Sequence, residues 1–112
     1  MRKLKSAWLP FLVANFLTQT ALGAQDEVLA LVEAVGVNSS DVIFFNIDSP
    51  VAIDSCMGKQ IVIPPHSAFR DRILSIVLAA KASGAKIAVK VSGCYQGAPT
   101  IENGKPGWVY IK

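Results

Sequence analysis

The sequence is poor in the residues that build metal and catalytic centres. Its 112 residues include one histidine, His66, and two cysteines, Cys56 and Cys94. Two lone cysteines cannot complete a zinc site, and no paired-carboxylate, phosphate-loop or metal-ligand spacing is present. We therefore predict no catalytic site, no metal site and no cofactor, and we expect a protein that is not an enzyme.

The three residue types of a Ser-His-Asp triad occur close together at Ser67, His66 and Asp71. Adjacent residues do not easily aim a nucleophile and its base at one substrate atom. We interpret His66 as a loop residue at the start of a helix. A small hydrolase is kept as a third, weaker class of function.

Charged residues are also scarce. They make up 17% of the chain against 52% hydrophobic residues, so the chain is too apolar for a disordered protein and too short for two ordinary domains. The formal net charge is +3, but three of the eleven basic residues are Arg2, Lys3 and Lys5. The surplus positive charge therefore belongs to the N-terminus rather than to a binding surface.

Residues 1–23 have the layout of a secretory signal peptide, with a positive start, an apolar run over residues 7–17 and small residues before Ala24. The alternative is an uncleaved membrane anchor, but a bilayer span needs roughly 20 apolar residues. We predict cleavage before Ala24, a periplasmic or secreted protein, and no stable membrane insertion after cleavage.

The predicted mature chain, residues 24–112, has 89 residues with 8 basic and 8 acidic side chains, so its net charge is 0. Nucleic-acid binding relies on surplus Lys and Arg along a face or groove. We therefore expect no nucleic-acid partner.

Export would place Cys56 and Cys94 in an oxidising compartment, where we expect them to pair. A redox role would instead favour a short Cys-x-x-Cys spacing. There are 37 residues between the two cysteines. For a loop of this length the chain-entropy model predicts that the bridge stabilises the fold by roughly 3 to 4 kcal/mol.

Five segments have the composition of strands, and one has the spacing of a helix. The strand segments are residues 28–37, which bend near Gly36, and residues 42–48, 60–63, 85–92 and 108–112. The helix is expected from an N-cap at Ser67 to a left-handed cap at Gly84, with Leu74 and Leu78 widening its buried face. Residues 93–99 are interpreted as a loop, after which Ile101 rejoins the sheet.

The order β-β-β-α-β-β is that of an OB-fold, a five-stranded Greek-key barrel, with its one helix between the third and fourth strands. A bent first strand and a helix with a broad apolar face both suit such a barrel. The competing interpretation is an open α+β sheet with the helix on one face.

Three features together carry a family resemblance: Cys56, the helix RILSIVLAAKASG over residues 72–84, and the strand with its cysteine, KIAVKVSGC, over residues 86–94. They resemble small exported bacterial proteins patterned like the B subunit of subtilase cytotoxin. The resemblance covers about half of the mature chain. It implies an OB-fold with a Cys56–Cys94 bridge and, in the toxin relatives, a ring of five that binds cell-surface glycans. No sugar-contacting residue is carried over.

Tyr95, Trp108 and Tyr110 are the candidate ligand-binding residues, because aromatic rings with a polar edge suit sugar rings or protein partners. Trp108 and Tyr110 share one face of the last strand. The alternative places Trp108 in the core, since the faces of a terminal strand cannot be assigned without its register.

The sequence therefore predicts a toxin-B-subunit-like binding protein that recognises a glycan and assembles as a homo-oligomer, a pentamer by the resemblance. The alternative is an envelope protein that contacts another protein through a strand edge, without glycan binding.

Overall fold

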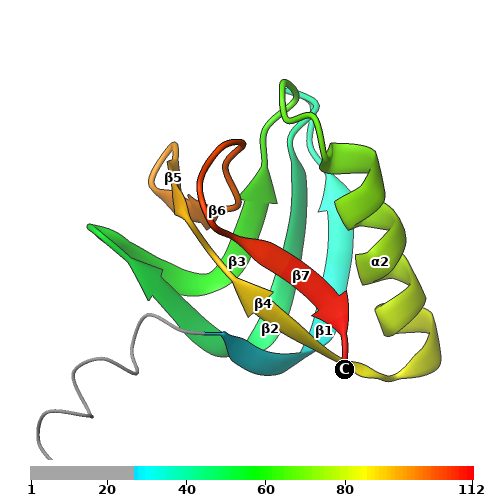
Figure 1. Ribbon diagram of the computed structural model, residues 1–112. Helices are drawn as coiled ribbons and strands as arrows, with labels where there is room; N and C mark the ends of the chain where they lie inside the picture. The colour runs from blue at the N-terminus through cyan, green and yellow to red at the C-terminus, as the bar shows by residue number, and fades with distance from the viewer. Residues whose placement is uncertain (1–26) are drawn as a thin grey trace, which may run out of the picture.

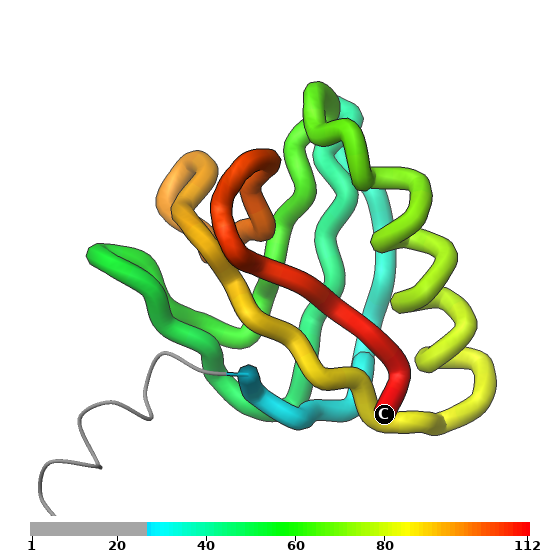
Figure 2. Tube along the Cα trace, viewed as in Figure 1, coloured from blue at the N-terminus to red at the C-terminus, as the bar shows by residue number. Residues whose placement is uncertain are grey.

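The computed structural model describes residues 27–112, which form one strongly curled sheet and one helix (Figures 1 and 2). The strands are β1 (Val28–Val37), β2 (Ile43–Ile53), β3 (Cys56–Ile63), β4 (Lys86–Lys90), β5 (Gly93–Tyr95), β6 (Ala98–Thr100) and β7 (Trp108–Ile111), and the helix is α2 (Arg70–Ser83). Their order in the sheet is β5-β6-β3-β2-β1-β4-β7. The predicted signal peptide, residues 1–23, lies outside the described residues.

The first strand joins the two halves of the sheet. Its N-terminal half pairs antiparallel with β4 and its C-terminal half pairs antiparallel with β2, with a shift of register between Val32 and Ala34. A bulge of this kind bends a strand and increases its twist. The predicted bend is therefore present, but it is centred near Glu33 rather than at Gly36. The ring of Phe44 covers Gly36, where an added Cβ would lie 2.7 Å from the end of that ring.

Strands β2 and β3 are longer than the sequence predicted. They continue as a hairpin arm to Ile53 and Cys56, which pair with each other at its tip and project from the body of the sheet (Figure 1). A disulfide joins Cys56 to Cys94 on β5, with their Cα atoms 6.2 Å apart. The predicted pairing is thus present, and it ties the arm to β5.

The segment predicted as a loop, residues 93–99, instead contains a small hairpin. Its strands β5 and β6 pair antiparallel, and β6 also pairs parallel with β3 through Val62 and Thr100. Gln96 and Gly97 at its turn have positive φ angles of 51° and 82°. Both central residues of a type I′ turn have positive φ, and the usual sequence signal for such a turn is Asn-Gly or Asp-Gly. Gln-Gly lacks that signal.

The helix begins and ends close to the predicted positions. Its buried side chains are Ile73, Val77 and Ala80, and it ends at Gly84 in the left-handed conformation, with φ 74°. Leu78 is 48% exposed, so the prediction that it widens the buried face was wrong. The prediction of an N-cap at Ser67 was wrong, because Phe69 occupies the N-cap position and no side chain caps the helix. The hydroxyl of Ser67 instead accepts the N–H of Phe69 at 3.2 Å, just before the helix.

The core fills the inside of the curled sheet and is closed on one side by α2 (Figure 1). Its largest fully buried side chains include Phe45, Ile47, Ile61, Ile63, Ile87 and Val89. Ser92, which follows β4, is buried. Its hydroxyl accepts the N–H of Glu102 at 2.7 Å, which satisfies both groups away from water.

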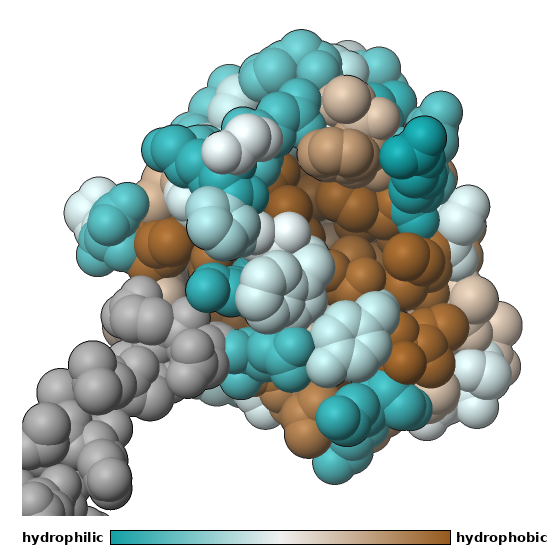
Figure 3. Space-filling model, in the orientation of Figure 1, coloured by the Kyte–Doolittle hydropathy of each residue, from teal (hydrophilic) through white to brown (hydrophobic). Residues whose placement is uncertain are grey.

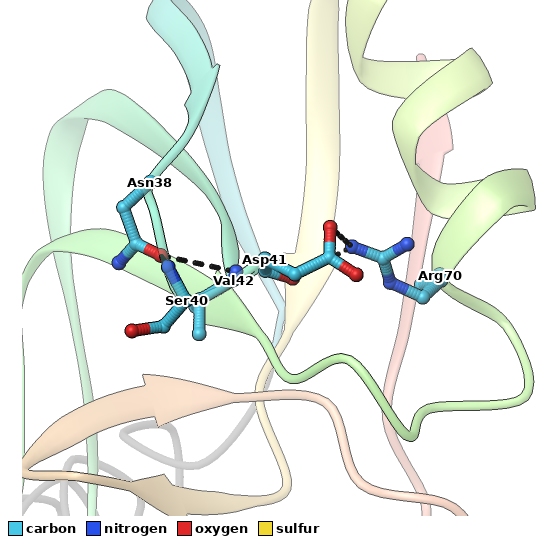
Figure 4. A network of polar contacts seen from close by, with 5 residues as sticks. All are labelled: Asn38, Ser40, Asp41, Val42 and Arg70. Atoms are coloured by element: carbon cyan, nitrogen blue, oxygen red, sulfur yellow. Dashed lines mark hydrogen bonds and ion pairs between the residues drawn. The ribbon is translucent and has the colours of Figure 1, made fainter.

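A polar turn connects the β1–β2 end of the sheet to the start of the helix (Figure 4). The side-chain oxygen of Asn38 accepts the N–H groups of Ser40 and Val42 at 2.9 and 3.1 Å. Arg70 donates to the backbone oxygen of Asp41 at 2.8 Å and pairs with its carboxylate at 3.1 Å. The first helical residue is therefore attached to the sheet. In residues 27–112, no helix combines the length and the apolar character that a membrane crossing requires.

Candidate functional site

The three aromatic residues predicted as ligand contacts do not form one site. Tyr95 lies on β5 and lines a pocket among the loops. Trp108 and Tyr110 lie on β7, on the opposite edge of the sheet order, and are 41% and 39% exposed. The alternative that buried Trp108 in the core is wrong, because the inward face of β7 belongs to Val109.

Trp108 and Tyr110 lie on the outer face of the sheet, where β7 pairs with β4 and β4 pairs with β1. Trp108 lies beside Lys90, and Tyr110 lies beside Ala88, which in turn lies beside Leu29. Glu27 directly precedes β1 and continues this register opposite Lys90. We call Glu27, Lys90, Trp108 and Tyr110 the aromatic cluster.

The carboxylate of Glu27 connects the two rings. It accepts the indole N–H of Trp108 at 2.8 Å and the hydroxyl of Tyr110 at 3.0 Å. The hydrogen bond to Glu27 is the main cause of a raised pKa of Tyr110; partial desolvation and the charge of Glu27 act in the same direction. The Nζ of Lys90 lies 5.0 Å from the centroid of the Trp108 ring, a cation–π distance. The cluster is therefore a fixed surface rather than a pocket.

The pocket that Tyr95 lines, which we call the loop pocket, has a volume of about 210 Å³. Its walls come from the β3–α2 loop, from β5 and from the segment after β6. The lining residues are Pro64, His66, Ser67, Cys94, Tyr95, Thr100, Ile101, Glu102 and Asn103. The rings of His66 and Tyr95 meet edge to face, with their centroids 6.0 Å apart.

Two walls of the loop pocket, β5 and β6 with the segment after it, are attached to β3 by the disulfide and a hydrogen bond. The hydroxyl of Thr100 donates to the carbonyl of Val62, and the N–H of Ser92 donates to the carbonyl of Thr100 at 2.9 Å. Glu102 pairs with Lys105 at 3.0 Å. Since most ligand pockets are largely formed before binding, this bracing suits a binding site.

The residues of the hypothetical triad are arranged differently from a catalytic site. Ser67 is buried, and its hydroxyl oxygen accepts the N–H of Phe69. His66 is exposed and faces Tyr95, while Asp71 lies in the first turn of α2. Within residues 27–112, no three His, Cys, Asp or Glu side chains are grouped closely enough to hold a metal ion.

A second hollow lies between β7 and α2, and we call it the β7 groove. It has a volume of about 200 Å³, and its lining residues are Phe69, Arg72, Ile73, Ile76, Ile101, Gly107, Trp108 and Val109. Figure 3 shows apolar side chains gathered between the front strand of the sheet and the helix. Trp108 therefore contributes both to the aromatic cluster and to this groove.

Sequence reasoning missed Glu27, Glu102 and Asn103. Glu27 acts across the sheet on residues more than 80 positions away, and only the register of β1, β4 and β7 places it there. Glu102 and Asn103 follow a hairpin that was interpreted as a loop. Comparison of the chain with protein-family models, with curated proteins and with solved structures finds no match. The function is therefore argued from the geometry of these sites.

Proposed function

We propose that this protein is an exported, non-catalytic binding protein that recognises a glycan through the loop pocket. The observation that carries the proposal is the mixed lining of that pocket. One part is apolar, from Pro64, Ile101 and the ring of Tyr95, and the other is polar, from His66, Glu102 and Asn103. A sugar ring has the same division, with C–H faces that pack on aromatic rings and hydroxyl groups that both donate and accept hydrogen bonds.

The size of the pocket supports a single sugar unit as the occupant. Its volume of about 210 Å³ is below the roughly 300 to 1,000 Å³ of pockets for drug-sized ligands. A terminal monosaccharide of a longer glycan fits this limit, and the rest of the glycan would extend into solvent.

We assign the sheet to the OB-fold on three observations. The helix lies between β3 and β4, β1 pairs with both β2 and β4, and β6 pairs parallel with β3. In this assignment β6 and β7 together occupy the place of the fifth strand, and β5 adds a short edge. The OB-fold is a common scaffold for oligosaccharide recognition by loops.

Export and assembly are part of the same proposal. The disulfide is typical of an exported small domain. A ring of five follows from the resemblance to toxin B subunits, and the native mass of the protein purified from an oxidising compartment tests it. A mass near five times that of one chain supports the ring, and a monomer contradicts it.

The test of glycan recognition is a glycan array probed with the exported, oxidised protein, followed by titration of the strongest glycan. Tyr95→Ala should weaken binding by at least about tenfold, or 1.4 kcal/mol, because it removes the aromatic wall. Tyr110→Ala is the matched control, since it removes a tyrosine from the aromatic cluster. If only Tyr110→Ala weakens binding, the glycan site lies on the aromatic cluster instead. If no glycan binds, the proposal fails.

A second candidate function is contact with an envelope protein through a strand edge. The specific observation in its favour is that β7 is the last strand of the sheet and borders the apolar β7 groove.

A further inference from the structure

The backbone of β7 offers hydrogen-bonding groups on its outer edge. The N–H of Lys112 donates to the carbonyl of Lys86 at 2.8 Å, and residues of an antiparallel strand alternate in direction. Trp108 and Tyr110 therefore bond toward β4, while the N–H and C=O groups of Val109 and Ile111 point away from it. Because β7 ends the sheet, no strand within residues 27–112 pairs with these groups.

The β7 groove lies directly beside this edge. Phe69 and Trp108 line it and are 40% and 41% exposed, so large apolar surfaces remain in water. Its one charged lining residue is Arg72, which is exposed and has no ion-pair partner within residues 27–112. An occupant of the groove would thus meet backbone donors and acceptors, an apolar floor and one positive charge.

We propose that β7 accepts an extended segment of a partner protein as an additional strand. Side chains of an extended chain alternate between two faces, so alternate apolar residues of the segment enter the groove. A carboxylate of the same segment pairs with Arg72. The occupant is an extended segment because the groove is narrow, bounded by β7 on one side and by residues of α2 on the other.

This inference deepens the second candidate function and is independent of glycan recognition. The groove and the loop pocket share only Ile101 among their lining residues. Variants on the outer edge of β7 should therefore leave glycan binding unchanged, and each proposal can fail without the other.

The experiment is a selection from a phage-displayed library of random linear heptapeptides on the exported, oxidised protein. The enriched peptides should be apolar at alternate positions and contain an acidic residue. The probe for all later measurements is the synthetic form of the most enriched peptide. Failure to enrich such peptides overturns the proposal.

Ile111→Pro is the decisive variant. Proline has no backbone N–H, and the N–H of Ile111 points away from β4 toward the proposed strand. Proline is tolerated on an edge strand in that position, so β4–β7 pairing should persist. Ile111→Ala is the matched control, which removes the side chain and keeps the N–H. The peptide should bind at least about tenfold more weakly to Ile111→Pro than to Ile111→Ala, with both variants folded by circular dichroism. Equal affinity contradicts strand addition.

Arg72 supplies the test of charge. Arg72→Glu should weaken the binding of the acidic peptide more than Arg72→Gln does. A peptide whose acidic residue is replaced by its amide should bind the two variants with equal affinity. If instead the native mass of the protein falls to that of a monomer only in Ile111→Pro, a second copy occupies the edge and the proposal is wrong.

Discussion

Glu27 determines the chemistry of the aromatic cluster, because one carboxylate accepts hydrogen bonds from both exposed rings. A carboxylate that accepts from a phenol stabilises its neutral form, and its negative charge opposes the phenolate. The pKa of Tyr110 is therefore raised above its ordinary value of 10.0. The contribution to stability is present below about pH 10 and is lost as the pH rises through the raised pKa.

Glu27→Gln should lower the pKa of Tyr110 toward its ordinary value. The amide oxygen can still accept a hydrogen bond, but the negative charge is absent. The measurement is a titration of phenolate absorbance in a Tyr95→Phe background, so that Tyr110 is the only tyrosine. An unchanged pKa would mean that the negative charge of Glu27 does not raise the pKa of Tyr110.

Gly84 is a residue whose role depends on backbone conformation alone. Its φ of 74° lies in the left-handed region, and an added Cβ would meet no atom within 4 Å. Gly84→Ala should therefore destabilise the fold by about 1 kcal/mol through strain rather than collision. Gly84→Asn should cost less, because asparagine tolerates this region. Urea unfolding measures both, and an equal loss for the two variants would contradict a conformational origin.

At the scale of elements, the helix was predictable because its signals are local. The apolar spacing and the glycine stop lie within residues 69–84, and α2 ends where they indicate. The β5–β6 hairpin was not predictable, because its strands have three residues each and β6 is held by a distant partner, Val62 on β3. Tyr95 was found as a candidate because of its residue type alone. Glu102 was not found, because its role depends on its position after this hairpin.

The exposed position of Leu78 was also not predictable from the helix alone, since a broad apolar stripe does not say which side chains the sheet covers. Val77→Ala should cost roughly 2 kcal/mol, because Val77 is fully buried under the sheet. Leu78→Ala, at the next position, should change stability by no more than about 0.5 kcal/mol. Urea unfolding of both variants tests the orientation of α2. Equal losses would show that α2 is rotated relative to this packing.

At the scale of the whole molecule, the curl of the sheet brings together parts that are distant in sequence. The β1 bulge bends the sheet, and β6 returns to pair with β3 while β7 pairs with β4. The order of the longer elements along the chain, three strands, a helix and a fourth strand, could be predicted because apolar segments and turns recur along the chain. The two hollows could not, because each combines side chains from at least three segments whose register is set by tertiary packing.

The disulfide is the covalent link across this arrangement, since it joins the hairpin arm to the wall of the loop pocket. Replacing both cysteines, Cys56→Ser with Cys94→Ser, should lower the free energy of unfolding by roughly 3 to 4 kcal/mol, mostly by releasing the unfolded chain. Because hydrogen bonds through Ser92 and Thr100 also brace the pocket, the folded variant should keep part of its glycan affinity at low temperature. Urea unfolding gives the first quantity and glycan titration the second. A loss of stability below about 1 kcal/mol would mean that the arm and β5 are held together by packing alone. Full loss of glycan binding in a folded variant would mean that the bridge itself forms the pocket.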